Sequence, residues 1–287
     1  MFETFQSQRI QTSGSEIFLR VGGNGPPLLL LHGYPQTHVI WHKIAPALAE
    51  RFTVVMPDLR GYGDSGKPES DAIHSPYSKR AMALDMVEVM ATLGFVRFRV
   101  VGHDRGARVA HRMARDHANA VERLAVLDIA PTLHMYENTD MRFASAYYHW
   151  FFLTQPQGLP ENLIGANPGY YLETKLGSWS TTGAAITPEA YKEYLRCFEK
   201  PETIHASCED YRASAGIDLE HDREPDERLS MPLLALWGEA GFVGSSYDVL
   251  ATWRKVANDV QGHAVPGGHF LPEEAPKETL RALLDFL

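Results

Sequence analysis

Residues 100–108 read VVGHDRGAR, and this stretch decides which fold the sequence predicts. It closes an apolar run that begins at Phe98 and opens a helical pattern that continues to His117. A strand that turns straight into a helix at Gly-x-Asp-x-Gly is typical of the nucleophile elbow, in which a tight turn holds the central side chain above the carboxyl edge of a parallel sheet. The alternative is an ordinary glycine-rich turn in which Asp104 caps the helix.

On both sides of this turn, patterns of buried strands alternate with patterns of helices. After an antiparallel hairpin at residues 3–21, the apolar run PPLLLL ends in the turn HGYP, as expected of a strand that is buried on both faces. The alternation predicts an α/β fold with a mostly parallel sheet and helices on both faces. The expected strands are 26–31, 52–56, 98–101, 123–127, 231–238 and a short one before Gly267, and the expected helices are 38–50, 78–93, 105–117, one that starts near Tyr247 and one at the end of the chain.

The middle of the chain departs from this alternation. Residues 136–224 contain no pattern of a buried strand, are rich in aromatic residues, and include helix-start signals such as Thr187-Pro188-Glu189. We therefore expect an inserted helical cap. The predicted organisation is a first part of the α/β core at residues 1–135, a helical cap at 136–224, and a second part of the core at 225–287.

The composition excludes several classes of partner. The chain has 287 residues, of which 44% are hydrophobic and 22% charged, and a net charge of −9 at pH 7. Such an acidic chain is poorly suited to bind nucleic acid or an anionic membrane surface, and its longest apolar run is far too short to span a bilayer. Cys197 and Cys208 lack metal-ligand spacing and do not suggest a disulfide framework, and the first 14 residues lack the pattern of a signal peptide. We therefore expect a cytoplasmic protein with no metal or cofactor.

Two residues far from the turn are candidate partners of Asp104. His269 lies in VPGGHFLP, between a short strand and the last helix, where this architecture places a general base. Asp128 ends the strand that follows the one before Asp104, and it would orient that histidine, with Glu239 as the minor alternative. The chain has 13 histidines, and carboxylates often cap helices, so a structural role is the competing interpretation.

The turn HGYP at residues 32–35 is a candidate for stabilising negative charge. A loop at this place supplies one backbone N–H of an oxyanion hole, here that of Tyr34, and the second comes from Arg105, the residue after Asp104. The alternative is a structural turn that needs Gly33 for its backbone.

Two arginines stand beside the turn. Arg105 and Arg108 are three residues apart in the predicted helix and therefore share one face. Their guanidinium groups can bind a small carboxylate through paired hydrogen bonds. The alternative is a solvated basic helix, because Arg112 and Arg115 continue the series, and for Arg115 we adopt that interpretation.

Together these motifs carry a family resemblance. HGYP, DLRGYGDS, GHDRG and GGH, with the intervening cap, resemble the α/β-hydrolase superfamily across nearly the whole chain. Within it, GHDRGARVAHR, the His-Trp pair of YYHWFF and the tyrosine of DYRAS are similar to the fluoroacetate (haloacetate) dehalogenases. The resemblance implies Asp104, His269 and Asp128 as catalytic residues, Arg105 and Arg108 as carboxylate-binding residues, His149, Trp150 and Tyr211 as a halide pocket with Tyr148 as a possible fourth member, and a homodimer.

The implied function is a hydrolytic dehalogenase that converts fluoroacetate and other short 2-haloacids to 2-hydroxy acids and halide through an ester of Asp104. An aspartate suits this reaction, because displacement of the halide leaves an ester that water can cleave, whereas a serine would leave an ether. The preferred halogen and the length of the acid depend on the volume of the pocket and stay open.

Three alternatives remain. An epoxide hydrolase would share the catalytic residues and would pair Tyr147 or Tyr148 with Tyr211, although a neutral epoxide does not need two arginines. A haloalkane dehalogenase usually has tryptophan and asparagine where this chain has Arg105 and Tyr34. A scaffold that only binds a small carboxylate would not need a complete catalytic set.

Overall fold

The computed structural model describes residues 1–181, 185–225 and 227–287. In this part of the chain, eight strands form one sheet in the order β1-β2-β4-β3-β5-β6-β7-β8. β1 and β2 are antiparallel and lie at one edge, and β3 to β8 run parallel to one another. The strands are β1 (Gln6–Gln11), β2 (Glu16–Gly22), β3 (Pro27–Leu31), β4 (Thr53–Pro57), β5 (Phe98–His103), β6 (Val121–Leu127), β7 (Leu233–Gly238) and β8 (Val260–Val265).

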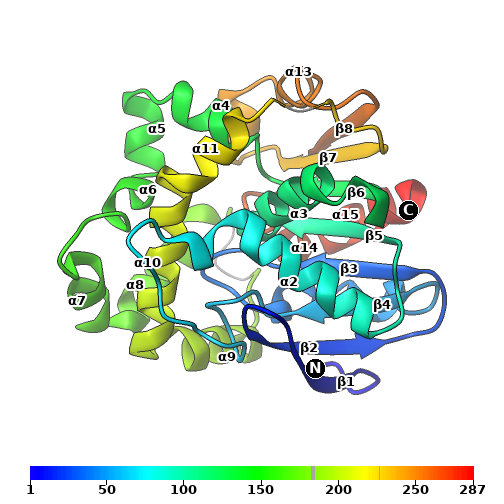
Figure 1. The fold of residues 1–287 in the computed structure, drawn as a ribbon, viewed down its shortest axis with the longest axis horizontal. Coiled ribbons are helices and arrows are strands. Elements are labelled where there is room, and N and C mark those ends of the chain that lie inside the picture. The colour runs from blue at the N-terminus through cyan, green and yellow to red at the C-terminus, as the bar shows by residue number, and fades with distance from the viewer. Residues whose placement is uncertain (182–184, 226) are drawn as a thin grey trace.

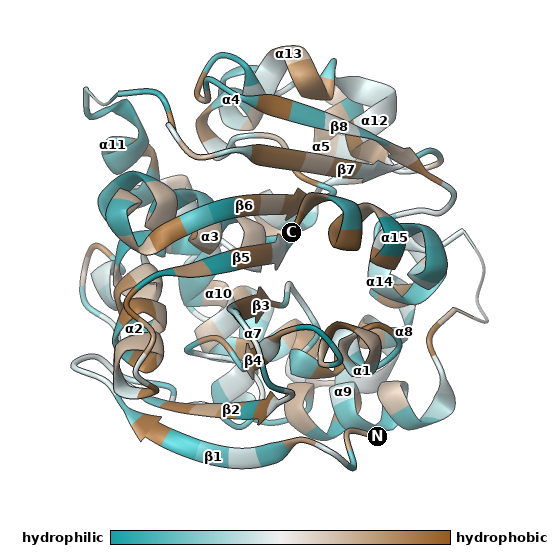
Figure 2. Ribbon diagram, turned by 90° about the vertical axis from the view of Figure 1, so that its right-hand side faces the viewer, coloured by the Kyte–Doolittle hydropathy of each residue, from teal (hydrophilic) through white to brown (hydrophobic). Residues whose placement is uncertain are grey.

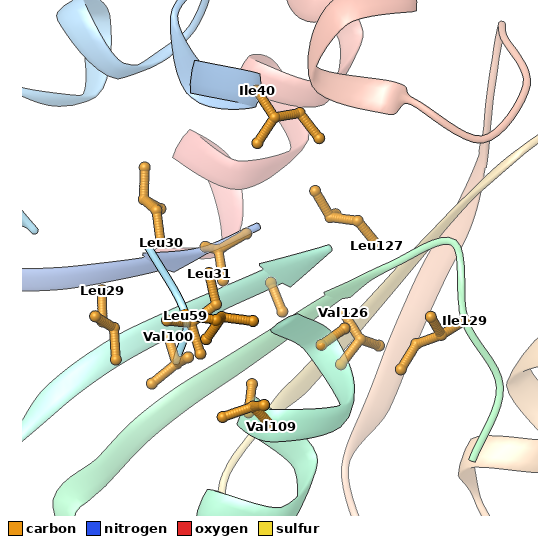
Figure 3. Packing of buried hydrophobic residues seen from close by; sticks show 14 of the residues in the cluster. Leu29, Leu30, Leu31, Ile40, Leu59, Val100, Val109, Val126, Leu127 and Ile129 are labelled. Atoms are coloured by element: carbon orange, nitrogen blue, oxygen red, sulfur yellow. The ribbon is translucent and has the colours of Figure 1, made fainter. Parts of the chain in front are cut away.

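Helices cover both faces of the sheet, which explains why its central strands are continuous apolar runs. In Figure 2, α2 (Lys79–Thr92) and α3 (Arg105–Asp116) lie on one side of the strands and α15 (Pro276–Phe286) lies on the other. Figure 3 shows Leu29 and Leu30 of β3 pointing to opposite sides of the sheet, and both side chains are fully buried. The predicted α/β fold with a mostly parallel sheet is confirmed.

One predicted helix is wrong in its extent. We expected a helix over residues 38–50, but the structure has a 3-10 turn, η1 (His38–Trp41), and a separate short helix, α1 (Ala45–Leu48). Pro46 explains the break, because proline has no N–H to bond the carbonyl of residue 42 and its ring clashes with that carbonyl. The remaining short helices of the core are α12 (Phe242–Ser246), α13 (Val249–Trp253) and α14 (Leu271–Glu274).

The segment between β6 and β7 is helical in its described residues. Among the described residues of 136–224 no strand occurs, and Thr187 caps a helix there as expected, since its side chain accepts a hydrogen bond from the N–H of Ala190. Figure 1 shows α5 to α8 and α10 beside the end of the sheet toward which the parallel strands run. The run of helices begins at Thr132, before the predicted limit, and the division into core and cap at residues 136 and 224 stays a prediction. These helices are α4 (Thr132–Glu137), α5 (Met141–Ala146), α6 (His149–Phe152), α7 (Leu159–Gly165), α8 (Pro168–Trp179), α9 (Pro188–Phe198), α10 (Pro201–Ala215) and α11 (Ile217–Arg223).

The turn between β5 and α3 is strained at its central residue. Asp104 has φ 46° and ψ −116°, a conformation that L-residues rarely adopt. The two flanking glycines serve close packing instead. A Cβ atom on Gly106 would lie 2.3 Å from the carbonyl oxygen of His32, and one on Gly102 would lie 2.5 Å from the Cα of Ala107. The turn therefore needs glycine for space, and Asp104 carries the strain.

Two further features of the fold concern membrane-spanning helices and the two cysteines. In the part of the chain that the structure describes, no helix combines the length and the apolar character that a membrane crossing requires. Cys197 and Cys208 are buried free thiols. Burial raises the pKa of Cys197 to about 12 and also raises that of Cys208, so both thiols stay protonated at neutral pH.

The space around the turn yields a first prediction. Gly106→Ala forces a methyl group against the backbone between β3 and the HGYP turn, and we expect it to lower the free energy of unfolding by about 1–3 kcal/mol or more. Gly177→Ala is the matched control, because this glycine lies in α8 with nothing within 4 Å of the position that a Cβ would take. That substitution should raise the free energy of unfolding by about 1 kcal/mol. Urea denaturation measures both, and equal effects of the two variants would contradict the assignment.

Candidate active site

Asp104 is held at the carboxyl end of β5, where α3 begins. Its side chain is buried, and its Oδ1 accepts a hydrogen bond of 2.9 Å from the backbone N–H of Tyr34, which lies in the HGYP turn. Burial alone would raise the pKa of Asp104, but the charges of His269, His103 and the two arginines lower it below its ordinary value. Asp104 is therefore an anion with one oxygen bonded and Oδ2 turned toward His269.

His269 lies between Asp104 and Asp128. Its Nδ1 donates a 2.7 Å hydrogen bond to Oδ2 of Asp128, and its Nε2 lies 3.9 Å from Oδ2 of Asp104. Oδ1 of Asp128 accepts a hydrogen bond of 3.1 Å from the N–H of Gly238 at the end of β7. Burial alone lowers the pKa of His269, but the bond to Asp128 raises it above the ordinary 6.5. Glu239, the alternative acid, has an exposed side chain.

Arg105 is bound on one edge by a carboxylate that the sequence did not reveal. Its Nε and Nη2 donate hydrogen bonds of 2.8 and 2.7 Å to the carboxylate of Asp210 in α10, and its guanidinium lies 4.1 Å from the ring centroid of Tyr211. Nη1 is buried and has no hydrogen-bond partner among the described residues. The expectation that the fork of Arg105 is available to a ligand is therefore wrong. Only its Nη1 is unoccupied.

Arg108 has no such counter-ion in the described part of the chain. Its Nη1 donates to Oγ1 of Thr132 at 2.9 Å and to the carbonyl of Ala130 at 3.2 Å, and its Nε is buried without a partner. The guanidinium lies over the ring of Trp150 at 4.7 Å. Burial lowers the pKa of Arg108 from its ordinary value, although the charge of Asp104 opposes this. Arg108 is thus a buried cation whose main favourable charge interaction is with Asp104.

A charged network holds Asp210 in place. Its carboxylate also accepts hydrogen bonds from the ammonium group of Lys79 and, at 2.6 Å, from the hydroxyl of Tyr62. Lys79 is in turn 3.2 Å from a carboxylate oxygen of Asp218. Burial alone would raise the pKa of Asp210, but Arg105 and Lys79 hold it well below its usual range. The network fixes the unoccupied nitrogen of Arg105 in one direction.

The residues expected to form a halide pocket lie together with Tyr34. The ring of His149 stacks on that of Tyr34 at 6.2 Å and meets Tyr211 edge-on at 5.5 Å. Nδ1 of His149 is buried and has no hydrogen-bond partner among the described residues, and burial holds the pKa of His149 well below 6.5. The ring centroid of Trp150 lies 6.5 Å from that of Tyr211. The cluster is therefore a buried aromatic surface with one ring nitrogen that has no hydrogen-bond partner among the described residues.

Tyr148 lies at the exposed side of this cluster, with its ring centroid 6.4 Å from that of His149. Its side chain is 46% exposed, and its ring lies beneath the ammonium group of Lys175 at 3.7 Å. Trp179, which the sequence did not single out, also belongs to this cluster, because its ring centroid lies 4.6 Å from that of His149 and 5.6 Å from that of His269. Trp179 also accepts the backbone hydrogen bond of His269 through its carbonyl at 2.9 Å.

Comparison with known proteins accords with this geometry. Residues 26–276 match the family described as the alpha/beta hydrolase fold. The chain belongs to the α/β-hydrolase family. This hydrolase is 46% identical to a fluoroacetate dehalogenase of a Burkholderia species, over all of its own length and 95% of the relative, which confirms the resemblance noted in the sequence. It is 35% identical to a soluble epoxide hydrolase of Corynebacterium sp. (strain C12), over 96% of the chain and 94% of the relative.

A solved structure is similar throughout to this α/β hydrolase. The crystal structure of ALR0039 from Nostoc sp PCC 7120 superposes with a TM-score of 0.99 and is 60% identical, with 100% of this chain and 99% of the other covered. The sheet, the helices between β6 and β7 and the loops that carry the candidate residues are therefore shared with a protein solved by crystallography.

One cluster in this α/β hydrolase has the composition of a metal site. Asp64, Glu193 and Cys197 offer ligand atoms within 4.8 Å of one another. Arg196 already pairs with both carboxylates at 2.6 Å, and the Cys197 thiol stays protonated. The cluster is better explained as an ion-pair network at the surface.

A buried acid ties the loops of the site together. Glu273, four residues after His269, accepts hydrogen bonds from the side chain of Gln36 at 2.5 Å and from the hydroxyl of Tyr194 at 3.2 Å. Burial raises the pKa of Glu273 to about 8. The HGYP turn, the loop of His269 and α9 of this hydrolase are thus joined through one carboxyl group.

Asp210, Lys79, Trp179 and Glu273 were missed in the sequence. For Asp210 a signal existed, since it directly precedes Tyr211 in the motif DYRAS. The others stand in no motif, and their roles follow from contacts between segments that are far apart in the chain.

The bond between Asp128 and His269 yields a second prediction. Asp128→Asn removes the charge that raises the pKa of His269, so we expect this pKa to fall below that of the unaltered protein. Glu239→Gln is the control and should leave it unchanged. NMR titration of the imidazole protons measures the pKa, with the His269 signal assigned by its loss in His269→Asn. A shift caused by Glu239→Gln and not by Asp128→Asn would reverse the assignment of the acid.

Proposed function

We propose that this α/β hydrolase is a hydrolytic dehalogenase that converts fluoroacetate and other short 2-haloacids to 2-hydroxy acids and halide. The observation that carries the proposal is the pair of buried guanidinium nitrogens beside Asp104, Nη1 of Arg105 and Nε of Arg108, that have no hydrogen-bond partner among the described residues. A buried donor without an acceptor is costly, and a substrate carboxylate would supply the acceptor that each nitrogen lacks.

In the first step, Oδ2 of Asp104 attacks the carbon that bears the halogen. The carbon–halogen bond breaks with its electron pair, and a carbon–oxygen bond to Asp104 forms, which gives an ester. Since Oδ1 is bonded to the N–H of Tyr34, Oδ2 is the oxygen available for attack. The halide departs toward Nδ1 of His149, the indole N–H of Trp150 and the hydroxyl of Tyr211, a set whose donors would replace its water shell.

In the second step, water cleaves the ester. Because Nδ1 of His269 donates to Asp128, its Nε2 is free to take a proton from the water, whose oxygen attacks the carbonyl carbon of Asp104. Negative charge then develops on Oδ1, which already accepts the N–H of Tyr34, and the N–H of Arg105 is the second proposed donor. Collapse of this intermediate releases the hydroxy acid and restores Asp104, so that Asp104, His269 and Asp128 form the proposed catalytic set.

The two arginines have different roles in binding the carboxylate of the substrate. Asp210 balances the charge of Arg105. The unoccupied Nη1 of Arg105 therefore orients the carboxylate by a hydrogen bond and adds little net positive charge. Arg108 has no carboxylate partner within the described residues and offsets the repulsion between Asp104 and an anionic substrate. Held by both groups, the carboxylate places the adjacent carbon in line with Asp104, and such positioning can contribute several kcal/mol to catalysis.

An epoxide hydrolase is the second candidate, favoured by the similarity to the Corynebacterium protein. It would use the same Asp104 and His269, with a cap tyrosine pair to donate to the epoxide oxygen. Tyr147 or Tyr148 would be the partner of Tyr211, and Tyr147 is the more deeply buried of the two. A neutral epoxide would leave the charge of Arg108 buried without an anion other than Asp104, so we prefer the haloacid.

We further propose that the protein acts in the cytoplasm as a homodimer, without a metal or cofactor, on a small haloacid and water. Support for the dimer comes from large apolar side chains exposed on the cap helices, among them Met141 at 84%, Leu163 at 59% and Tyr170 at 69%. An interface between two copies of the chain would cover such side chains. Light scattering measures the mass in solution and tests the dimer.

The carboxylate site yields a third prediction. We expect fluoride release from fluoroacetate, and Arg108→Gln should lower kcat/KM by about 10–100-fold, because a charged hydrogen bond contributes about 1.5–3 kcal/mol. Arg115→Gln on the same helix, where Arg115 pairs with Asp222 at 3.2 Å, should leave kcat/KM nearly unchanged. A fluoride electrode measures the rates. Turnover of styrene oxide without halide release from any haloacetate would establish the epoxide hydrolase instead.

The two-step route yields a fourth prediction. His269→Asn cannot activate water, so the variant should form the ester of Asp104 and fail to break it. Mass spectrometry should then find a carboxymethyl group on Asp104 after incubation with fluoroacetate. In the unaltered enzyme, a single turnover in ¹⁸O-water should place the label in Asp104, and label found in the hydroxy acid alone would exclude the ester.

A further inference from the structure

Lys175 in α8 is a buried cation with an unusual environment. Its side chain is only 2% exposed, and its ammonium group lies 3.7 Å from the ring centroid of Tyr148, 5.2 Å from that of Trp179 and 5.5 Å from that of Tyr171. Within the described residues it has neither a carboxylate at ion-pair distance nor a hydrogen bond. Burial lowers its pKa to about 8.

The other buried or half-buried lysines near the site are satisfied. The ammonium group of Lys79 pairs with Asp210 and Asp218, and that of Lys43 donates to the carbonyls of Ala185 and Glu273 at 2.6 and 2.7 Å. Aromatic faces attract a cation but supply no counter-charge. Lys175 therefore lacks an oxygen acceptor for its ammonium group among the described residues, whereas the other two lysines have acceptors.

Lys175 lines a pocket that reaches the candidate active site. The pocket has a volume of about 330 Å³, and its walls include Tyr147, Trp179, Phe242 and His269. His269 belongs to the proposed catalytic set, so the pocket joins the cation in the cap to the catalytic histidine in the core. Its size is sufficient for an anion of a few atoms.

We propose that Lys175 forms an outer anion site, in which a small monovalent anion rests in this pocket before it reaches His269 or after it leaves. The anion is the carboxylate of an incoming haloacid or the departing halide. The proposal rests on the proposed dehalogenase function for the identity of these anions, whereas the binding of an anion at Lys175 does not depend on turnover.

The outer site is separate from the carboxylate site. The inner anion is held by the unoccupied nitrogens of Arg105 and Arg108, which contact Tyr211 and Trp150, and none of these four residues lines the pocket. The rings of His149 and Trp179 are in contact, at 4.6 Å, between the two regions. Because the pKa of His149 lies well below 6.5, its ring is neutral and leaves the charge of Lys175 unaltered.

The test uses bromide as the probe and the fluorescence of Trp179 as the signal. Bromide quenches an indole that it contacts, and Trp179 lies beside the ammonium group. We expect a saturable component of the quenching that comes from Trp179 and is lost both in Trp179→Phe and in Lys175→Met, whereas quenching of Trp150 by bromide in the proposed halide pocket persists in both variants. Lys175→Arg keeps the charge and should keep the quenching, and Lys192→Met removes a charge from an exposed position on α9 as the matched control.

The kinetics then distinguish the two anions. A tenfold fall in kcat/KM for fluoroacetate in Lys175→Met with unchanged kcat assigns the site to the incoming carboxylate. A fall in kcat with weaker inhibition by added halide assigns it to the departing halide. Arg108→Gln should lower kcat/KM by about 10–100-fold while the bromide signal of Trp179 persists, so a failure of the proposed dehalogenase function stays distinguishable from a failure of the outer site. The Trp179 component is the difference in quenching between the unaltered protein and Trp179→Phe. An equal Trp179 component in Lys175→Met, or a component that never saturates, would overturn the outer site.

Discussion

The buried ion pair between Arg105 and Asp210 connects the two halves of the site. Arg105 is the first residue of α3 in the core, directly after Asp104, and Asp210 lies in α10 beside Tyr211. Breaking one partner of such a buried pair costs about 3–5 kcal/mol, since a charge is left without compensation. The pair therefore fixes the position of α10 over the elbow, and with it the tyrosine that closes the proposed halide pocket.

The rest of the site follows from the edge of the sheet. Asp104 comes after β5 and Asp128 after β6, His269 follows β8, and all three lie where parallel strands end together. Both aspartates have positive φ, 46° and 53°, so each turns sharply out of its strand toward the helices above. The core thus presents two carboxylates and an imidazole, and the helices between β6 and β7 supply the aromatic surface that covers them.

Local patterns in the sequence predicted this core well. The apolar runs of β3 and β5 and the spacing of Gly102, Asp104 and Gly106 are signals that a few consecutive residues carry. The break at Pro46 shows the limit of prediction from hydrophobic periodicity. The helical apolar pattern continues through residues 38–50, but a proline within it prevents a continuous helix. Lys175 stands in no motif, and the motif that contains Asp210 does not indicate that its partner is Arg105. Arg105 and Asp210 are 105 residues apart, and the partners of a buried charge follow from packing between helices rather than from spacing along the chain.

The uncompensated guanidinium of Arg108 has a consequence for how the protein behaves on the bench. A ligand that binds only the folded chain stabilises it, by about 2.7 kcal/mol at a concentration one hundred times its dissociation constant. Acetate and formate carry the same carboxylate as the proposed substrate, without a leaving group. The melting temperature of this protein should therefore depend on the buffer anion, and a preparation in acetate would be a complex with its own buffer.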